Sequence, residues 1–453
     1  MKKWLLMLLM GAIMTTATAC GSGSDAGSNG KEQAKEKQTN KEGKTVVTLS
    51  IQEPGPFYEA LKKKFEEKYP DIDLQIQSYK NAGEKWDPGD YEKYKKTMNT
   101  ALLSGKGADI YDLGSLPNEE YEQYVSKQLL LNMNDYMQQD QTLNKNDLKM
   151  SILDALKLKG GLYTVPSGYF MRPFVGDGNA IQNSSVKIDD KTWNWKTFDE
   201  ISRQLIQQAN KGGKKQLYAL ANNPPEVTLQ EMVVDSYSEF VNREAKKVQF
   251  DSPAFIELLQ QVKKMYDAKV ITSDEAKMGN QLFYSSVIMS PSDLIDGPYS
   301  AFENPVLLQK PHSGQSGGIR IIPTSQFGIQ AKSPVKEEAW KFISFMLSDE
   351  AQSLNEREGF SLLTSVNNKK LDELQEKVKS GSYKLPTGKE AKVPDEAFTK
   401  FKQIVQDADQ YAGLDGKVIS IVGEESASFF GGQKSAEEVA KLIQNRTTTF
   451  INE

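Results

Sequence analysis

The sequence predicts an α/β fold, because its first ordered segments have the pattern of a strand, a helix and a second strand within about 35 residues. Residues 45–51 (TVVTLSI) favour a buried strand. Behind Pro56, residues 57–69 carry apolar side chains at helical spacing, and apolar and polar side chains alternate in residues 71–79. These three segments predict a βαβ unit with parallel strands and a right-handed crossover.

Later segments repeat these patterns. Ala108–Leu113, Ser286–Ser290 and Gly318–Pro323 are short apolar runs that predict buried strands. Amphipathic segments lie between them, and their apolar faces predict helices packed on a sheet. The sequence has no internal repeat at the periods of solenoid proteins.

Four of these helices have recognisable starts. Thr197 and Ser435 are each followed three residues later by a glutamate, which is the capping-box pattern. Ser252 and Ser333 each precede a proline, which predicts a capping side chain and a proline in the first helical turn.

The N-terminus predicts an exported protein. Two lysines, the apolar run Trp4–Met14 and small residues up to Ala19 follow the order of a signal peptide, which we place at residues 1–19. The run is shorter than the ~20 residues of a membrane-spanning helix, so we expect it to be removed. Cys20, the single cysteine, then becomes the first residue, and its surroundings resemble a bacterial lipobox. This resemblance implies a lipid anchor; the alternative is a free buried thiol.

Residues 20–44 predict a linker. Gly21–Lys44 contains no aromatic or large aliphatic residue, so it cannot bury enough apolar surface to fold, and we expect it to be disordered. Once Cys20 is lipidated no cysteine is left for a disulfide, and the fold must depend on packing. The chain also exceeds the roughly 250–300 residues at which single cores divide, which predicts more than one domain.

Composition restricts the function only in part. The 56 basic and 61 acidic side chains are well mixed, which argues against a nucleic-acid partner. His312 is the single histidine, lies in a loop segment and has no second histidine or cysteine to complete a metal site, so we expect an exposed residue. We find no motif for a nucleotide or another cofactor and expect none. A glycosidase that uses two carboxylates stays open, because sequence does not reveal their separation.

Six segments in a fixed order resemble the family 1 extracellular solute-binding proteins, receptors of ABC importers that include maltodextrin and multiple-sugar binders. They are FEEKYPDIDLQIQSY, YEKYKKTMNTALLSGKGADIYDL, LYTVPSGYF, WNWKTFDEISRQL, FDSPAFIELLQQVKKMYDAKVI and FGIQAKSPVKEEAWKFISFMLSDEAQS. The resemblance implies two α/β lobes joined by hinge strands, with a cleft that closes on a solute. We place the N-lobe at residues 45–168 plus 290–352 and the C-lobe at 169–289 plus 353–453.

Candidate ligand residues come from two sources. Ligands in open α/β sheets bind beyond the carboxyl ends of strands, which favours Gln52, Glu53, Tyr111 through Ser115 and Tyr169 through Arg172. The resemblance adds the loop after the first helix of the C-lobe, with Asn222, Asn223 and Glu226. Stacking against a sugar favours Trp86, Tyr169 and Tyr237. Many family members carry an aromatic residue where this chain has Ser290 and Asp293, which either bind a different glycan or cap a helix.

The resemblance therefore implies a monomeric, lipid-anchored receptor on the extracellular face of a bacterial cell membrane. Its expected partners are a small-molecule solute, most simply a carbohydrate, and the permease subunits of an ABC importer. Three alternatives stay open: a surface enzyme that acts with two carboxylates, a receptor for a peptide, polyamine or anion, and a receptor that signals to a sensor kinase.

Overall fold

The computed structural model describes residues 36–209, 216–243, 245–277, 279–312, 318–411 and 413–452. The expected signal peptide, Cys20 and the linker up to residue 35 lie outside the described residues. The last residues of the expected linker contact the folded chain, because the amide of Val46 donates to the carbonyl of Gln38 and Lys37 pairs with Glu338 at 2.7 Å.

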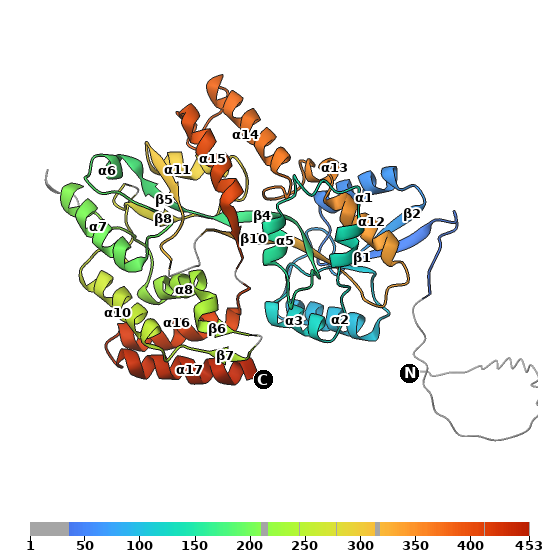
Figure 1. Cartoon of the computed structure of the whole chain (residues 1–453), viewed down its shortest axis with the longest axis horizontal. Coiled ribbons are helices and arrows are strands. Elements are labelled where there is room, and N and C mark those ends of the chain that lie inside the picture. Colours follow the sequence, from blue (N-terminus) through green and yellow to red (C-terminus); the bar gives the residue numbers. More distant parts are fainter. Residues whose placement is uncertain are drawn as a thin grey trace, which may run out of the picture. The chain divides into compact units, whose positions relative to one another are not determined.

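A mixed sheet forms the first region of the fold, with the strand order β11-β10-β3-β1-β2 and with β4 also paired to β10 (Figure 1). Its strands are β1 (Thr45–Ile51), β2 (Ile72–Ser78), β3 (Ile110–Asp112), β4 (Val165–Arg172), β10 (Ile319–Ile329) and β11 (Ala408–Gln410). The predicted βαβ unit is confirmed, because β1 and β2 are parallel and α1 (Pro56–Lys68) connects them. The predicted strands at Ala108–Leu113 and Gly318–Pro323 are confirmed as β3 and β10.

Helices cover both faces of this sheet. On one face, Phe65 of α1 packs against Phe342 and Phe345 of α12 (Lys336–Met346), with ring centroids 5.4 and 5.7 Å apart. On the other face, Tyr111 of β3 packs in an apolar cluster with α2 (Asp90–Ser104) and α3 (Asn118–Ser126). Neighbouring side chains of a strand point to opposite faces, which explains why Ile110 packs on the face with α1 and α12 whereas Tyr111 packs on the face with α2 and α3. The remaining helices of the region are α4 (Asn134–Gln139), α5 (Met150–Ala155), α13 (Asp349–Gln352), α14 (Thr364–Lys379) and α15 (Asp395–Asp407).

The second region surrounds a smaller antiparallel sheet in which β5 (Phe174–Asp177) lies between β8 (Phe283–Ser285) and β9 (Pro305–Leu308). Phe174 stacks on Phe283 with centroids 5.4 Å apart. A short hairpin joins β6 (Val241–Asn242) to β7 (Lys247–Val248). The helices of this region are α6 (Gly178–Gln182), α7 (Trp195–Ala209), α8 (Pro225–Asp235), α9 (Tyr237–Phe240), α10 (Pro253–Asp267), α16 (Gly416–Phe430) and α17 (Ala436–Asn452). Leu294 and Ile295 of α11 (Asp293–Ala301) instead pack in the apolar cluster of the first sheet.

Pro173 alone separates β4 from β5, so at this residue the chain passes directly from the first sheet to the second. Besides the smaller cluster around Tyr111, the buried apolar side chains form one large cluster around the first sheet and another around the second. Buried residues between Phe360 and Ala408 pack in the first cluster, although we placed this segment in the C-lobe. The division into two lobes stays a prediction.

Three local predictions are wrong. Ser286–Ser290 is no strand: Ile288 is buried and forms a single bridge to Met171, while Val287 and Met289 are exposed because no further strand covers them. Thr197 lies inside α7, and Asn194 caps that helix by accepting from the amides of residues 196 and 197. Ser333 does not cap α12, which begins at Lys336. Its hydroxyl instead donates to Asp109 and accepts from the amide of Val335.

The other two helix starts are confirmed. Ser252 accepts a hydrogen bond from the amide of Phe255, and Ser435 and Glu438 each accept from the other's amide. Within the described ranges, no helix combines the length and the apolar character needed to cross a membrane.

Candidate functional site

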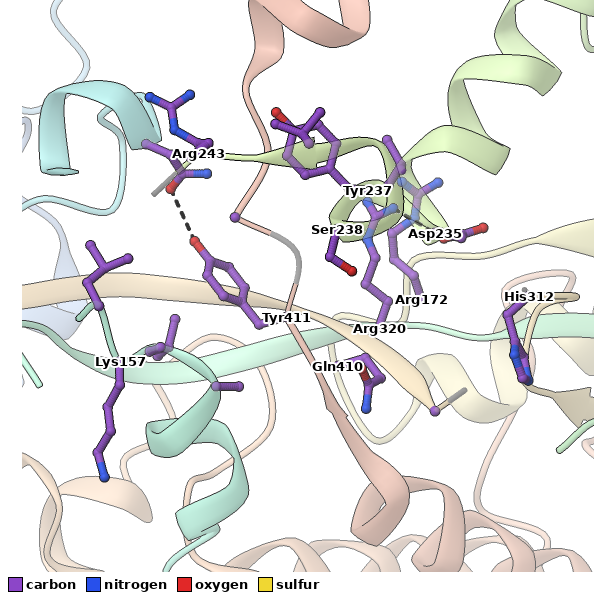
Figure 2. A pocket seen from close by; sticks show the side chains of 18 of the residues that line it. Lys157, Arg172, Asp235, Tyr237, Ser238, Arg243, His312, Arg320, Gln410 and Tyr411 are labelled. Carbon is purple, nitrogen blue, oxygen red and sulfur yellow. Dashed lines mark hydrogen bonds and ion pairs between the residues drawn. The ribbon is translucent and has the colours of Figure 1, made fainter. Parts of the chain in front are cut away.

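A cavity of about 300 Å³ lies between the two regions (Figure 2). The first region contributes side chains from α3, from the end of α5 and from the segment after β11. The second contributes side chains from α8, α9 and β6. The end of β4 and the start of β10 supply Arg172 and Arg320.

Arg172 and Arg320 are directly opposite one another in the antiparallel pairing of β4 with β10. Like charges in this position repel and destabilise a sheet. Two carboxylates of α8, Glu231 and Asp235, lie one helical turn apart and offset this repulsion. Arg172 Nη2 lies 3.2 Å from both carboxylate oxygens of Glu231, and Arg320 Nη1 lies 3.5 Å from Asp235 Oδ1.

Lys310 completes this group, which we call the cationic cluster: Arg172, Lys310 and Arg320 with Glu231 and Asp235. The ammonium of Lys310 donates to Glu231 Oε2 at 2.6 Å and lies 3.6 Å from Asp235 Oδ2. Its side chain is 7% exposed, so these two carboxylates replace most of its hydration. Three cations against two carboxylates leave an excess of one positive charge.

The two carboxylates respond differently to this environment. Burial raises the pKa of Glu231, but the charges of Lys310 and Arg172 outweigh it and bring that pKa down to about 2. Burial raises the pKa of the more deeply enclosed Asp235 despite Lys310 and Arg320. Desolvation also lowers the pKa of Arg320.

Several nitrogen atoms of this part of the cavity are buried and have no hydrogen-bond partner among the described residues. They are Arg172 Nε and both ring nitrogens of His312, while Arg320 Nη1 has only its long contact of 3.5 Å with Asp235 Oδ1. The expectation of an exposed His312 is wrong: the residue is 6% exposed, and its backbone amide donates to the carbonyl of Trp193, which holds the loop against the second region. A buried polar atom without a partner is costly, so these atoms are suited to a polar ligand.

Arg243 and Lys157 supply the cations at the other end of the cavity. The guanidinium of Arg243 lies 2.7 Å from Glu122 Oε2 and also pairs with Asp415, whose side chain is fully buried. The hydroxyl of Tyr411 donates to Asn118 Oδ1 at 3.2 Å. These contacts join α3 to the hairpin strand β6 and to the segment before α16.

Three tyrosines line the same cavity: Tyr121, Tyr237 and Tyr411. Tyr237 is 6% exposed, whereas Tyr121 and Tyr411 are half-buried. Burial raises the pKa of all three hydroxyls, that of Tyr411 to about 12. They are therefore neutral at physiological pH and present an aromatic body with a polar tip.

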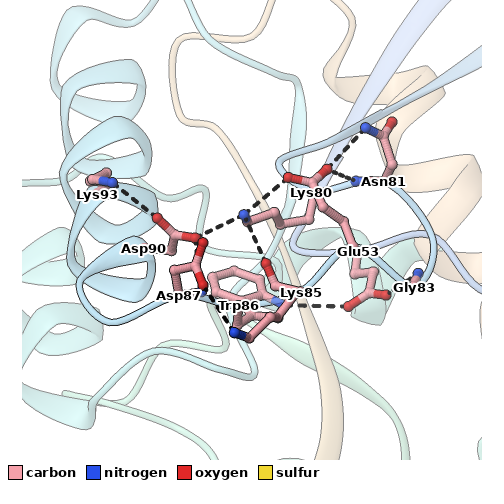
Figure 3. Close-up of polar contacts among 10 residues, drawn as sticks. Glu53, Lys80, Asn81, Gly83, Lys85, Trp86, Asp87, Asp90 and Lys93 are labelled. Carbon is pink, nitrogen blue, oxygen red and sulfur yellow. Dashed lines mark hydrogen bonds and ion pairs between the residues drawn. The ribbon is translucent and has the colours of Figure 1, made fainter.

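Of the predicted ligand residues, Arg172 and Tyr237 line this cavity and the others do not. Glu53 and Trp86 instead hold a loop of the first region together (Figure 3). Glu53 accepts from the amide of Gly83 at 2.8 Å and from Trp86 Nε1 at 3.4 Å. The Trp86 ring stacks on Tyr79 with centroids 5.9 Å apart, and the ammonium of Lys80 lies 5.6 Å from its centre.

The predicted residues at the other strand ends are also engaged in the fold. Tyr111 is 1% exposed, and Tyr169 is fully buried with its hydroxyl 3.3 Å from the carbonyl of Val405. The backbone carbonyl of Ser115 accepts from Tyr91, and that of Gln52 accepts from the amide of Lys80.

The predicted loop residues of the second region make local contacts. Asn222 accepts from the amide of Ala276 at 2.8 Å, and the carbonyl of Asn223 accepts from Tyr266 at 2.5 Å. Glu226 lies in the first turn of α8. Ser290 is 2.9 Å from the hydroxyl of Ser292, and Asp293 accepts from the amide of Met289 at 2.8 Å. The ligand role of all these residues stays a prediction.

Sequence patterns did not reveal several residues that line the cavity or pair with residues there. The set comprises Asn118, Glu122, Glu231, Asp235, Arg243, Lys310, Arg320 and Tyr411. The spacing of Glu231 and Asp235 gave one signal, since carboxylates four residues apart share a helix face. Their partners come from distant segments that the tertiary fold alone brings together. Within the described ranges, no group of three His, Cys, Asp or Glu residues could hold a metal ion.

Comparison with known proteins gives the family. Residues 50–353 match the family described as bacterial extracellular solute-binding protein. This chain belongs to that family. The match begins at the end of β1 and extends past β10, so it also covers the smaller second sheet.

Solved structures of low sequence identity share the fold, and each covers 90% of this chain. An oligogalacturonide-binding protein from Yersinia enterocolitica is 16% identical, covered over 99% of its length, with a TM-score of 0.61. A family 1 extracellular solute-binding protein from Alicyclobacillus acidocaldarius is 15% identical, covered over 99%, with a TM-score of 0.60. A substrate-binding protein from Listeria monocytogenes in complex with cycloalternan is 16% identical, covered over 99%, with a TM-score of 0.55.

Proposed function

We propose that this chain captures a carbohydrate, specifically an oligosaccharide, and delivers it to the permease of an ABC importer. Membership of the solute-binding family supports this role, and two structural neighbours bind an oligogalacturonide and cycloalternan. The observation that carries the proposal is a cavity with tyrosines and partnerless polar atoms between two separately packed regions. Sugars use both features, stacking on aromatic rings and exchanging hydrogen bonds through their hydroxyl groups.

Lobe closure is the proposed mechanism of capture. We retain a division into two lobes and assign residues 360–408 to the first, because their apolar side chains pack in its cluster. Bending at Pro173 and near the start of β10 would bring α3 and α8 together around the solute. The solute favours closure only by its greater affinity for the closed state.

We also propose that Cys20 carries the lipid that tethers the receptor to the extracellular face of the membrane. A single acyl chain binds membranes marginally and two bind stably, so a diacyl group would suffice. The role proposed is binding without chemical change to the solute, which distinguishes it from an enzyme that acts with two carboxylates.

A thermal-shift panel of mono- and oligosaccharides tests the proposal. At a hundred times the dissociation constant, a bound solute adds about 2.7 kcal/mol to the free energy of unfolding. We expect at least one saccharide to raise the melting temperature by several degrees and to be recovered unaltered by chromatography. Recovery of cleaved products would contradict a receptor role, and a panel without any shift would contradict carbohydrate as the solute class.

A further inference from the structure

We propose that the solute carries a carboxylate, as an oligosaccharide containing hexuronic acid does, and that Arg172 and Arg320 bind that group. This inference rests on the proposed function and names the class of sugar.

Strand pairing supplies the first argument. Arg172 and Arg320 face each other directly across β4 and β10, so the sheet itself holds two guanidinium groups next to the cavity. Glu231 and Asp235 contact them from α8, on the second region. A guanidinium whose position is fixed in this way loses little conformational entropy when it binds a planar oxyanion.

Charge supplies the second argument. The cationic cluster has one more cation than carboxylates, and burial restricts its hydration. A monoanion would neutralise this excess, whereas the two charges of a phosphate monoester would exceed it. A neutral sugar would leave the excess charge uncompensated inside a closed cleft, which costs free energy.

Available donors supply the third argument. Arg172 Nε is buried in a residue that lines the cavity and has no hydrogen-bond partner in the described part of the chain, and Arg320 Nη1 has only its long contact of 3.5 Å with Asp235 Oδ1. Figure 2 shows Arg172 and Arg320 side by side, with His312 on a separate segment of the wall. A carboxylate accepts up to four hydrogen bonds through two oxygens and matches the planar donors of arginine.

The opposite end of the cavity makes such a solute bind in one orientation. That end has no excess of positive charge, because Arg243 pairs with Glu122 and Asp415, and Lys157, which also lines the cavity, pairs with Asp154. The three tyrosines line the cavity and offer aromatic surface to sugar rings. A carboxylate at the cationic cluster would therefore fix which end of the oligosaccharide enters first.

Isothermal titration calorimetry with matched saccharides tests the inference. The panel consists of galacturonate, glucuronate and mannuronate trimers, the methyl ester of each, and the corresponding neutral trimers. Esterification keeps size and shape and removes the charge. We expect an acidic trimer to bind at least about tenfold more tightly than its ester. This ratio of affinities corresponds to the contribution of roughly one charge-assisted hydrogen bond.

Variants assign the effect to the cationic cluster. R320Q and R172Q should each weaken binding of the acid by about tenfold while changing binding of the ester much less. R446Q is the matched control, because Arg446 lies on α17 and pairs with Glu424 and Glu425 away from the cavity. If R320Q lowers stability, the double variant R320Q/D235N removes the ion pair as a whole and keeps the test interpretable.

Different results overturn the two proposals. Equal or tighter binding of an ester or neutral trimer would overturn the carboxylate inference and leave the carbohydrate receptor intact. Preference for a sugar phosphate would overturn it as well. Absence of binding by every saccharide would overturn the proposed function, and the inference with it.

Discussion

The hydroxyl of Tyr237 donates a hydrogen bond of 3.0 Å to the buried carboxylate of Asp415 and accepts one of 3.2 Å from its amide. The contact joins the start of α9 to the residue before α16. A fully buried carboxylate depends on such donors and on Arg243, because it has lost its hydration. This pair therefore fixes one wall of the cavity.

Replacing Tyr237 by phenylalanine should lower the free energy of unfolding by about 1–3 kcal/mol, because the carboxylate of Asp415 loses a buried donor. Chemical denaturation of both proteins measures this change. Y136F is the control, since Tyr136 bonds to Glu337 at an exposed site and its loss should cost under about 0.5 kcal/mol. Equal stability of Y237F and the parent protein would contradict the role assigned to this hydroxyl.

Burial of Lys149 should make the free energy of unfolding depend on pH in the alkaline range. Its ammonium donates to the carbonyls of Val405 and Gln406, each at 2.8 Å, at the end of α15. Burial lowers the pKa of Lys149 from 10.5 to about 8, against the opposing charges of Asp409 and Asp407. Between these values the unfolded chain binds more protons than the folded one, so stability rises with pH.

Relative to K149M, the parent protein should gain about 2 kcal/mol of stability between pH 8 and pH 10. The comparison with the variant removes the contribution of the other titrating groups. K145M serves as a control from the same segment, because Lys145 makes an exposed contact with the carbonyl of Gln138. A stability difference between parent and K149M that stays constant over this range would refute the prediction.

The fold could be predicted from the sequence where its signals are local. The strand, helix and strand of residues 45–78 depend on side-chain periodicity within each segment, and the structure has all three. Ser286–Ser290 shows the limit of such a signal, because an apolar run becomes a strand only where partner strands are available. The single bridge between Ile288 and Met171 does not provide one.

The candidate site was less predictable because its residues come from separate elements. Arg172 was found from its place at a strand end, but its neighbour Arg320 follows only from the pairing of β4 with β10. His312 gave no periodic signal, so its burial could not be foreseen. Trp86 has the composition of a stacking residue, yet Tyr79 and Lys80 occupy its surroundings.

Glu231 should make the free energy of unfolding depend on pH in the acid range as well. Its folded pKa of about 2 lies below the ordinary value of 4.5, after Lys310 and Arg172 overcome the effect of burial. The corresponding stabilisation is fully present above pH 4.5 and is lost as the pH falls toward 2. E231Q lacks this contribution, so the stability advantage of the parent protein should shrink over that range.

At neutral pH, E231Q should be less stable by about 2–3 kcal/mol, because Lys310 and Arg172 lose a largely enclosed carboxylate. Denaturant titrations at pH 7, 4.5 and 3 measure the difference. E376Q is the control, since Glu376 forms an exposed pair with Lys379. An advantage of the parent over E231Q that grows on acidification would contradict the expected direction of this pH dependence.

β4 has no room for a side chain at Gly168. A Cβ at this position would lie 2.6 Å from Arg357 Nη1 and 2.7 Å from the carbonyl oxygen of Phe360. The Phe360 carbonyl cannot yield easily, because Phe360 and Tyr169 form a backbone bridge in both directions. The Arg357 guanidinium is also held, by the carbonyls of Gln352, Glu358 and Gly359.

G168A should therefore lower the free energy of unfolding by about 1–3 kcal/mol, the usual cost of overpacking. The same substitution at Gly416, the first residue of α16, meets no atom within 4 Å and should be neutral or stabilising by up to about 1 kcal/mol. Thermal and denaturant unfolding of the two variants compare the sites directly. If G168A is as stable as G416A, the segment 352–360 must yield under β4 more readily than its hydrogen bonds indicate, and this end of the first sheet is not rigid.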